Sequence, residues 1–175
     1  MGIPRRMAIG LLIGLLTIGA LGLGLRLFMD RDAENRLRPG EAAALGEMRG
    51  KLPANGFLAC PAGYCRIADA ATSPAFAMGA DRLAEHWAHL IAREPRIAAV
   101  FAEPQERRFV LVQHSVALRF PDVVTVEFVV LDAGRSSLAI YSRARYGRYD
   151  FGVNRRRVSA WLHRLQQPAR PAAGQ

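Results

Sequence analysis

The feature that most constrains this chain is an uncharged, apolar run near its amino terminus. No charged residue occurs between Met7 and Leu25. About 19 helical residues span roughly 28 Å, which is close to the thickness of the hydrocarbon core of a bilayer. We therefore predict a single transmembrane helix within residues 1–28, acting as a signal anchor, with the membrane lipid bilayer as its partner.

A cleaved signal peptide is the alternative interpretation of this run. Arg5 and Arg6 supply the basic start of such a peptide, but residues 22–24, Gly-Leu-Gly, are a poor cleavage site. No cysteine follows the run closely, so the chain offers no acceptor for the lipid of a bacterial lipoprotein. Gly10 and Gly14 have the spacing of a small-xxx-small pair, through which two such helices can form a homodimer.

The two cysteines, Cys60 and Cys65, favour a local disulfide. They are too few for a zinc site without distant histidines, and their spacing differs from a redox C-x-x-C motif. Arginines flank the apolar run on both sides, so the positive-inside rule does not decide its orientation. Because a disulfide suits an oxidising compartment, we predict a single-pass protein of the bacterial inner membrane with a periplasmic domain.

The charge balance is basic, with 24 Lys+Arg against 15 Asp+Glu, and Lys51 is the only lysine. Such a dominance of arginine is common in proteins from GC-rich bacterial genomes. We therefore expect a negatively charged membrane surface as the neighbour of this chain, and no nucleic acid.

The rest of the chain divides into three parts. Residues 29–40 alternate acids with arginines and end in Pro-Gly, which indicates a solvated juxtamembrane stalk. Residues 41–167 form one α+β domain, and residues 168–175, rich in proline and alanine, form a disordered tail.

Hydrophobic periodicity predicts an antiparallel sheet of about four strands packed by two or three helices. Helices are expected at Glu41–Arg49, at Asp81–Arg93 with Asp81 as its cap, and at Val153–Gln166. Turn residues between them favour irregular structure through the cysteine loop. The expected strands are Arg96–Glu103, Arg107–Phe120, Val123–Leu131 and Leu138–Arg145.

The third of these strands predicts how the sheet is covered. One face is continuously apolar, so helices should cover it, whereas Thr125 and Glu127 interrupt the other face, which should be packed less fully. The apolar face consists of Val124, Val126, Phe128 and Val130.

The segment 141–157 is dense in polar groups although it joins a core strand to a core helix. Ser142 shares its face with core residues, while Tyr141 and Arg143 point the other way with Arg145 and create an arginine-aromatic surface. On the helix, Asn154 and Arg157 lie one turn from core positions. Both should be at least partly buried and should have hydrogen-bond partners.

Two interpretations of this segment remain open. In the first, Asp150 pairs with an arginine and caps the final helix, so that the polar groups form a structural staple. In the second, Arg145, Arg148 and Arg157 bind a carboxylate or phosphate together with N–H groups of the helix start. Asp122 can neutralise one of these arginines or cap a turn, and turn chemistry is the simpler expectation.

The residues predict no catalytic centre, metal site or cofactor. The chain contains no Gly-x-Ser-x-Gly, Walker loop or His-Glu-x-x-His. His86 and His89 are three apart on a predicted helix, and solvated surface histidines are the simpler interpretation of them.

Several of these residues resemble the domain of unknown function family numbered 1499, found in bacteria and plastids. The resemblance covers Leu58 to Leu165 and departs from the family at Tyr141, at Ala144 and in the short cysteine loop. It implies a shared fold and brings no established activity. It is carried by Cys60-Pro61, by Phe120-Pro121-Asp122, and by Ser142, Arg145, Gly147, Asp150, Gly152, Asn154 and Arg157.

Three functional hypotheses follow from these observations. The first is a non-enzymatic envelope protein that binds an anionic or lipid-like ligand, or a partner protein, through the region from Arg145 to Arg157. The second is an enzyme that acts on an envelope substrate in a polar cleft near Asp150 and Asn154. The third is a structural protein in which these polar residues form a fold staple.

Overall fold

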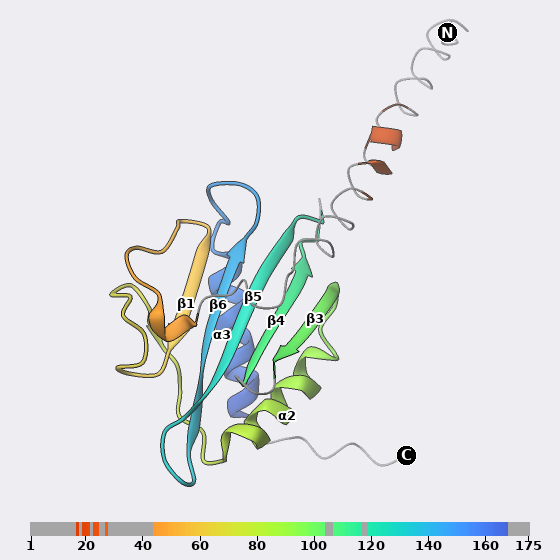
Figure 1. Cartoon of the computed structure of the whole chain (residues 1–175). Coiled ribbons are helices and arrows are strands. Elements are labelled where there is room, and N and C mark those ends of the chain that lie inside the picture. Colours follow the sequence, from red (N-terminus) through yellow and green to blue (C-terminus); the bar gives the residue numbers. More distant parts are fainter. Residues whose placement is uncertain are drawn as a thin grey trace, which may run out of the picture.

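The computed structural model describes residues 44–103, 107–116 and 119–167, together with some helical positions between residues 17 and 27. The described domain contains six strands, two α-helices and one 3-10 turn (Figure 1). In chain order these are η1 (Leu45–Glu47), β1 (Gly56–Cys60), β2 (Ala71–Thr72), α2 (Ala80–Ile91), β3 (Ile97–Glu103), β4 (Arg108–His114), β5 (Pro121–Val130), β6 (Ser136–Ala144) and α3 (Val153–Gln166).

All six strands belong to one sheet, in the order β2-β1-β6-β5-β4-β3. Strands β3 to β6 form the antiparallel meander that the sequence predicts, and β1 pairs antiparallel with β6. Only β2 runs parallel to its neighbour, β1. The α+β class is confirmed, and the expected number of about four strands is wrong because β1 and β2 extend the sheet beyond β6.

Strand β1 is missing from the sequence prediction because turn residues surround it. Phe57, Leu58, Ala59 and Cys60 are four consecutive buried residues between Asn55 and Pro61. Such a short apolar run is typical of a strand covered on both faces, for which period-two alternation gives no signal. Phe57 and Ala59 pack in the helix-side core and Leu58 and Cys60 in a second core on the other face, while β6, the hydrogen-bonded partner of β1, lies about 80 residues later in the sequence.

The two α-helices cover one face of the sheet, as predicted (Figure 1). Their tryptophans, Trp87 and Trp161, meet edge to face with ring centroids 5.4 Å apart over the apolar residues of β5 and β6. Helix α2 begins at Ala80 with Gly79 as its N-cap, so the predicted cap at Asp81 is wrong. Asp81 lies in the first turn, where a carboxylate also favours the helix dipole.

The opposite face is covered by η1 and the cysteine loop, which form a smaller second core. Thr125 and Glu127 are 5% and 4% exposed, so the expectation of a less packed face is wrong at these positions. The carboxylate of Glu127 can be buried because it accepts hydrogen bonds from the backbone N–H of Leu45 at 3.0 Å and from Tyr64 Oη at 3.0 Å. Arg108 Nε donates to it at 3.1 Å and neutralises its charge.

The covering segment is held by close packing and by a covalent bond. Cys60 and Cys65 form the predicted disulfide, which closes the loop that carries Tyr64. A Cβ at Gly46 would come within 3.3 Å of the Tyr64 ring, so this close approach favours glycine. The helix predicted at Glu41–Arg49 is wrong in its described part, because this part contains only the three-residue 3-10 turn η1.

Other predictions concern the ends of the chain. Among the described residues, no helix is long and apolar enough to cross a membrane. Most of the predicted transmembrane segment, the Gly10 and Gly14 pair, the stalk at residues 29–40 and the tail at residues 168–175 lie outside the described residues.

Candidate functional site

The turn before α3 is fixed by Asp150. Its Oδ1 accepts the backbone N–H of Gly152 at 3.0 Å, and its Oδ2 accepts the N–H of Asn154 at 2.8 Å. Gly152 has a φ of 75°, a left-handed conformation that glycine adopts without steric penalty. Asp150 thus satisfies N–H groups at the helix start, as one of the two sequence interpretations expects.

Asn154 joins the start of α3 to two strands. It is completely buried, and its Oδ1 accepts hydrogen bonds from Ser142 Oγ at 2.6 Å and from an Arg157 nitrogen at 2.6 Å. Its Nδ2 donates to the carbonyl of Asn55 at 3.0 Å, just before β1. The predicted burial of Asn154 is confirmed, and its side chain is used within the fold.

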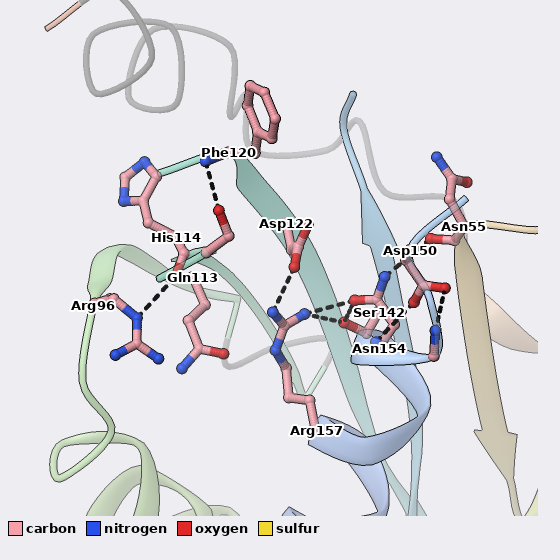
Figure 2. A network of polar contacts seen from close by, with 12 residues as sticks. Asn55, Arg96, Gln113, His114, Phe120, Asp122, Ser142, Asp150, Asn154 and Arg157 are labelled. Carbon is pink, nitrogen blue, oxygen red and sulfur yellow. Dashed lines mark hydrogen bonds and ion pairs between the residues drawn. The ribbon is translucent and has the colours of Figure 1, made fainter. Parts of the chain in front are cut away.

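Arg157 connects α3 to β5 and β6 (Figure 2). One terminal nitrogen donates to Ser142 Oγ at 2.9 Å and to Asn154, while the other contacts Asp122 Oδ2 at 2.5 Å. The side chains of Arg157 and Asp122 are 8% and 7% exposed. This group of five residues, named here the Arg157 cluster, consists of Asn55, Asp122, Ser142, Asn154 and Arg157.

Asp122 rather than Asp150 is the partner of the arginine, which corrects two expectations from the sequence. Asp122 lies inside β5, opposite Ala144 of β6, and therefore has a sheet position instead of a turn position. Alternation along β5 gives Asp122 the same face as Val124, which packs towards the helices. Its carboxylate can thus reach Arg157 on α3.

Asn55 is the member of the Arg157 cluster that the sequence analysis missed. Its Nδ2 donates to the carbonyls of Ala144 at 3.2 Å and Gly147 at 2.6 Å, at the end of β6. The only signal in the sequence is an Asn-Gly pair, which is typical of an ordinary turn. Asn55 instead fixes the start of β1 against the β6–α3 loop.

Burial and ion pairing oppose each other at Asp122. Burial raises the pKa of this carboxyl above its usual value, and the Arg157 guanidinium lowers it by charge and by hydrogen bonding. Asp150 is different because, although burial raises its pKa, the N–H groups of Asn154 and Gly152 hold it below the usual value. Both oxygens of Asp150 thus accept backbone N–H groups, and Oδ2 of Asp122 pairs with Arg157.

The predicted anion site from Arg145, Arg148 and Arg157 is changed by this geometry. Both terminal nitrogens of Arg157 and the N–H groups of Gly152 and Asn154 already have partners in the fold. The backbone N–H of Arg145 donates to Pro121 at 3.1 Å, while Arg148 is exposed in the β6–α3 loop. Arg148 is therefore the exposed arginine of the three, while Arg145 is partly buried and Arg157 is held within the Arg157 cluster.

An arginine-aromatic surface exists, but it lies on the β6–α3 loop rather than on strand β6. Tyr141 lies on the face opposite Ser142, as strand alternation predicts, but it is half-buried against the second core instead of forming part of a surface. In the loop, Tyr149 is 69% exposed and Phe151 is 89% exposed. Phe151 has a φ of 52°, a conformation that is strained for a bulky residue.

The strain at Phe151 is maintained by the surrounding contacts. Asp150 precedes it and holds the turn, and Arg156 from the first turns of α3 donates to the carbonyl of Phe151 at 2.9 Å. A second arginine, Arg155, lies 4.7 Å from the centre of the Phe57 ring. The loop is thus a defined structure that presents an aromatic ring to solvent.

The sequence matches the family described as protein of unknown function (DUF1499) over residues 68–165, more than half of the chain. The chain belongs to the DUF1499 family. The match confirms the resemblance seen in the sequence, although it begins at Ala68 rather than at Leu58. No curated protein matches the chain.

The match separates two parts of the DUF1499 domain in this chain. Four members of the Arg157 cluster, Asp122, Ser142, Asn154 and Arg157, lie within the matched residues. Asn55, just before strand β1, and the cysteine loop of the cover lie ahead of the matched residues. The matched segment therefore contains the complete connection between α3, β5 and β6.

Proposed function

We propose that this DUF1499 protein is a non-enzymatic, membrane-anchored envelope protein whose β6–α3 loop binds an anionic partner with apolar character. The observation that carries the proposal is Phe151, held 89% exposed in a left-handed backbone conformation. A strained residue persists only where its surroundings fix it, and such residues concentrate at binding and switch regions. The Arg157 cluster supplies that rigid support.

The charge of the loop favours an anionic partner. Six arginines and one aspartate occur between residues 143 and 157. The aspartate, Asp150, accepts two backbone hydrogen bonds, and Arg157 pairs with Asp122 outside this segment. A positive charge beside exposed aromatic rings suits a ligand that combines an acidic group with apolar surface.

Two features support a location at a membrane. The run from Met7 to Leu25 is uncharged, and within it Leu21 and Leu23 are 74% and 59% exposed at helical positions. Exposed apolar side chains are typical of segments that meet lipid or another protein. The disulfide between Cys60 and Cys65 supports the periplasmic side of a bacterial inner membrane.

The enzyme hypothesis has less support from the geometry. It relied on Asp150 and Asn154 as groups in a polar cleft. Asn154 is completely buried, and both carboxylate oxygens of Asp150 accept backbone N–H groups of the α3 start. A general acid or base must be able to reach substrate, and these side chains instead hold the turn.

Native mass spectrometry of the full chain, released from its own membrane in mild detergent, tests the proposal. We expect the wild type to carry an additional mass that the double variant Arg148→Ser/Phe151→Ser loses without a change in melting temperature. Arg82→Ser/Leu131→Ser is the matched control, because Arg82 is exposed on α2 and Leu131 is 41% exposed at the other end of the sheet. Retention of the mass by the loop variant, or its loss from both variants, would contradict the proposal.

A further inference from the structure

Exposed apolar side chains gather at one end of the sheet. There β4 ends, β5 begins and β6 passes into α3 (Figure 1). In the β4–β5 connection Val116 is 77% exposed, and in the β6–α3 loop Tyr149 and Phe151 are 69% and 89% exposed. This group, with the exposed Arg148, is named here the aromatic end and consists of Val116, Arg148, Tyr149 and Phe151.

The two connections of the aromatic end are held together. The rings of Phe120 and Tyr146 contact each other with centroids 6.2 Å apart, one ring from each connection. The backbone N–H of Arg145 donates to the carbonyl of Pro121 at 3.1 Å. The two connections therefore lie side by side at this end of the sheet.

The opposite end of the sheet has exposed apolar residues but a different charge. In the β5–β6 hairpin, Val130 and Leu131 are 52% and 41% exposed. Beside them Asp132 and Arg135 form a salt bridge at 2.6 Å, so their charges neutralise each other. At the aromatic end Asp150 is held by backbone N–H groups and Asp122 pairs with Arg157, whereas Arg148 is exposed.

We infer that the aromatic end lies in the interfacial region of an anionic bilayer, with Tyr149 and Phe151 among the lipid headgroups and Arg148 at their phosphates. This inference rests on the proposed function and names the partner of its loop. Aromatic side chains accumulate at the membrane–water interface, and arginines near the surface of an anionic leaflet add electrostatic attraction. The apolar run from Met7 to Leu25 supplies a second membrane contact in the same chain.

Position-specific fluorescence in reconstituted full chain tests this inference. Phe151→Trp places a reporter at the aromatic end, and Leu131→Trp places a matched reporter at the opposite end. The native tryptophans, Trp87 and Trp161, are each 1% exposed and give a constant background fluorescence, which is measured with the wild-type chain. Vesicles contain phosphatidylcholine alone or with phosphatidylglycerol, and carry bromine on the acyl chains as a short-range quencher.

We expect the brominated lipid to quench the Phe151→Trp reporter strongly in vesicles with phosphatidylglycerol and several-fold less in phosphatidylcholine alone. The Leu131→Trp reporter should stay at the wild-type level in both. Adding Arg148→Ser to Phe151→Trp should reduce the quenching in the anionic vesicles. Equal quenching of the two reporters, or none at the aromatic end, would overturn the inference.

Soluble glycerol phosphate distinguishes a lipid surface from a site for free phosphate. If it abolishes the quenching at low millimolar concentration, the loop binds a phosphate group and the bilayer inference is wrong. Persistent quenching supports the bilayer surface. A bound mass that depends on Arg148 and Phe151 in mass spectrometry, together with no quenching, would leave the proposed function standing and remove only the membrane as its partner.

Discussion

The ion pair between Arg157 and Asp122 is buried on both sides, with side chains 8% and 7% exposed. Burying two charges carries a large desolvation penalty, so such a pair persists only with good geometry and additional hydrogen bonds. Ser142 and Asn154 provide those bonds to the guanidinium. Each residue in the Arg157 cluster therefore depends on the others.

Removing the arginine should be more damaging than neutralising its partner. Arg157→Ala leaves the Asp122 carboxylate buried without a cation, and we expect a loss of about 3 kcal/mol or more in unfolding free energy. Asp122→Asn keeps an acceptor for Arg157, whose bonds to Ser142 and Asn154 remain, so the expected loss is about 1–2 kcal/mol. Urea unfolding of the full chain, followed by tryptophan fluorescence, measures both. Equal losses would contradict this account.

The deficit of Arg157→Ala should also depend on pH. Burial already raises the pKa of Asp122, and the variant lacks the guanidinium that opposes this effect. A carboxyl with a raised pKa in the folded state takes up its proton before the unfolded chain does, so folding gains stability as pH falls. We expect the difference from wild type to shrink between about pH 7 and pH 5.

The double variant Arg157→Ala/Asp122→Asn is the control for this pH dependence. It contains no carboxyl at residue 122, so its deficit should not shrink in the same range. Asp150 and His114 also act electrostatically on Asp122 and are present in all of these variants. A deficit of Arg157→Ala that grows with acid would show that Asp122 is not the group responsible.

The β6–α3 loop combines backbone strain with exposure of an aromatic ring. Because Phe151 has a φ of 52° and packs against little, Phe151→Gly should relieve strain. We expect an increase of up to about 1 kcal/mol in unfolding free energy, together with loss of partner binding. Tyr149→Gly is the matched control, since Tyr149 is exposed without a positive φ and its replacement should not stabilise the fold. A destabilised Phe151→Gly chain would refute the assignment of strain.

The cover of the second face depends on Glu127. Glu127→Gln keeps an oxygen acceptor for Leu45 and Tyr64 but removes the charge that Arg108 Nε contacts. Because Arg108 keeps its second carboxylate partner, Glu103, we expect a loss of about 1–2 kcal/mol, and faster hydrogen exchange at the Leu45 N–H. Glu103→Gln should have a smaller effect, because Glu103 is the more exposed partner of Arg108, at 19% against 5% for Glu127.

The same carboxylate affects Tyr64. Burial and the neighbouring Glu127 raise the pKa of Tyr64 to about 12. The phenol therefore stays neutral in the folded domain at alkaline pH values where an unfolded chain ionises it. The neutral, hydrogen-bonded phenol of Tyr64 thus stabilises the fold below about pH 10, and this contribution declines as the pH rises towards about 12.

For the molecule as a whole, the sequence predicts the α+β class, the meander and the two helices. Their periodic apolar residues, such as Val124 on β5 and Trp161 on α3, carry that information locally. Strand β1 was not predicted because Phe57 to Cys60 carries no alternation and its partner β6 is distant in sequence. The choice of Asp122 rather than Asp150 as the arginine's partner also depends on sheet register, which no local pattern specifies.

The shared strands should make the two layers unfold together. The helix layer and the cover, formed by η1 and the cysteine loop, pack on opposite faces of β1, β5 and β6. The Arg157 cluster also links β5, β6 and the start of β1 to α3. We expect the free energy of unfolding from tryptophan fluorescence, which reports the helix face, to equal that from hydrogen exchange at the Leu45 N–H, which reports the cover. A clearly smaller free energy at the Leu45 N–H in the wild-type chain would show that the cover opens independently of the helix layer.

The pairing of β1 with β6 has a consequence for how the chain is made. Asn55 and Asn154, which are bonded to each other, are 99 residues apart in sequence. A chain that emerges amino terminus first presents the apolar strand Phe57 to Cys60 long before its partner strand exists. The newly made chain must therefore keep that strand from other contacts until its carboxyl-terminal third has been synthesised, and β1 is the segment at which a holding chaperone would act.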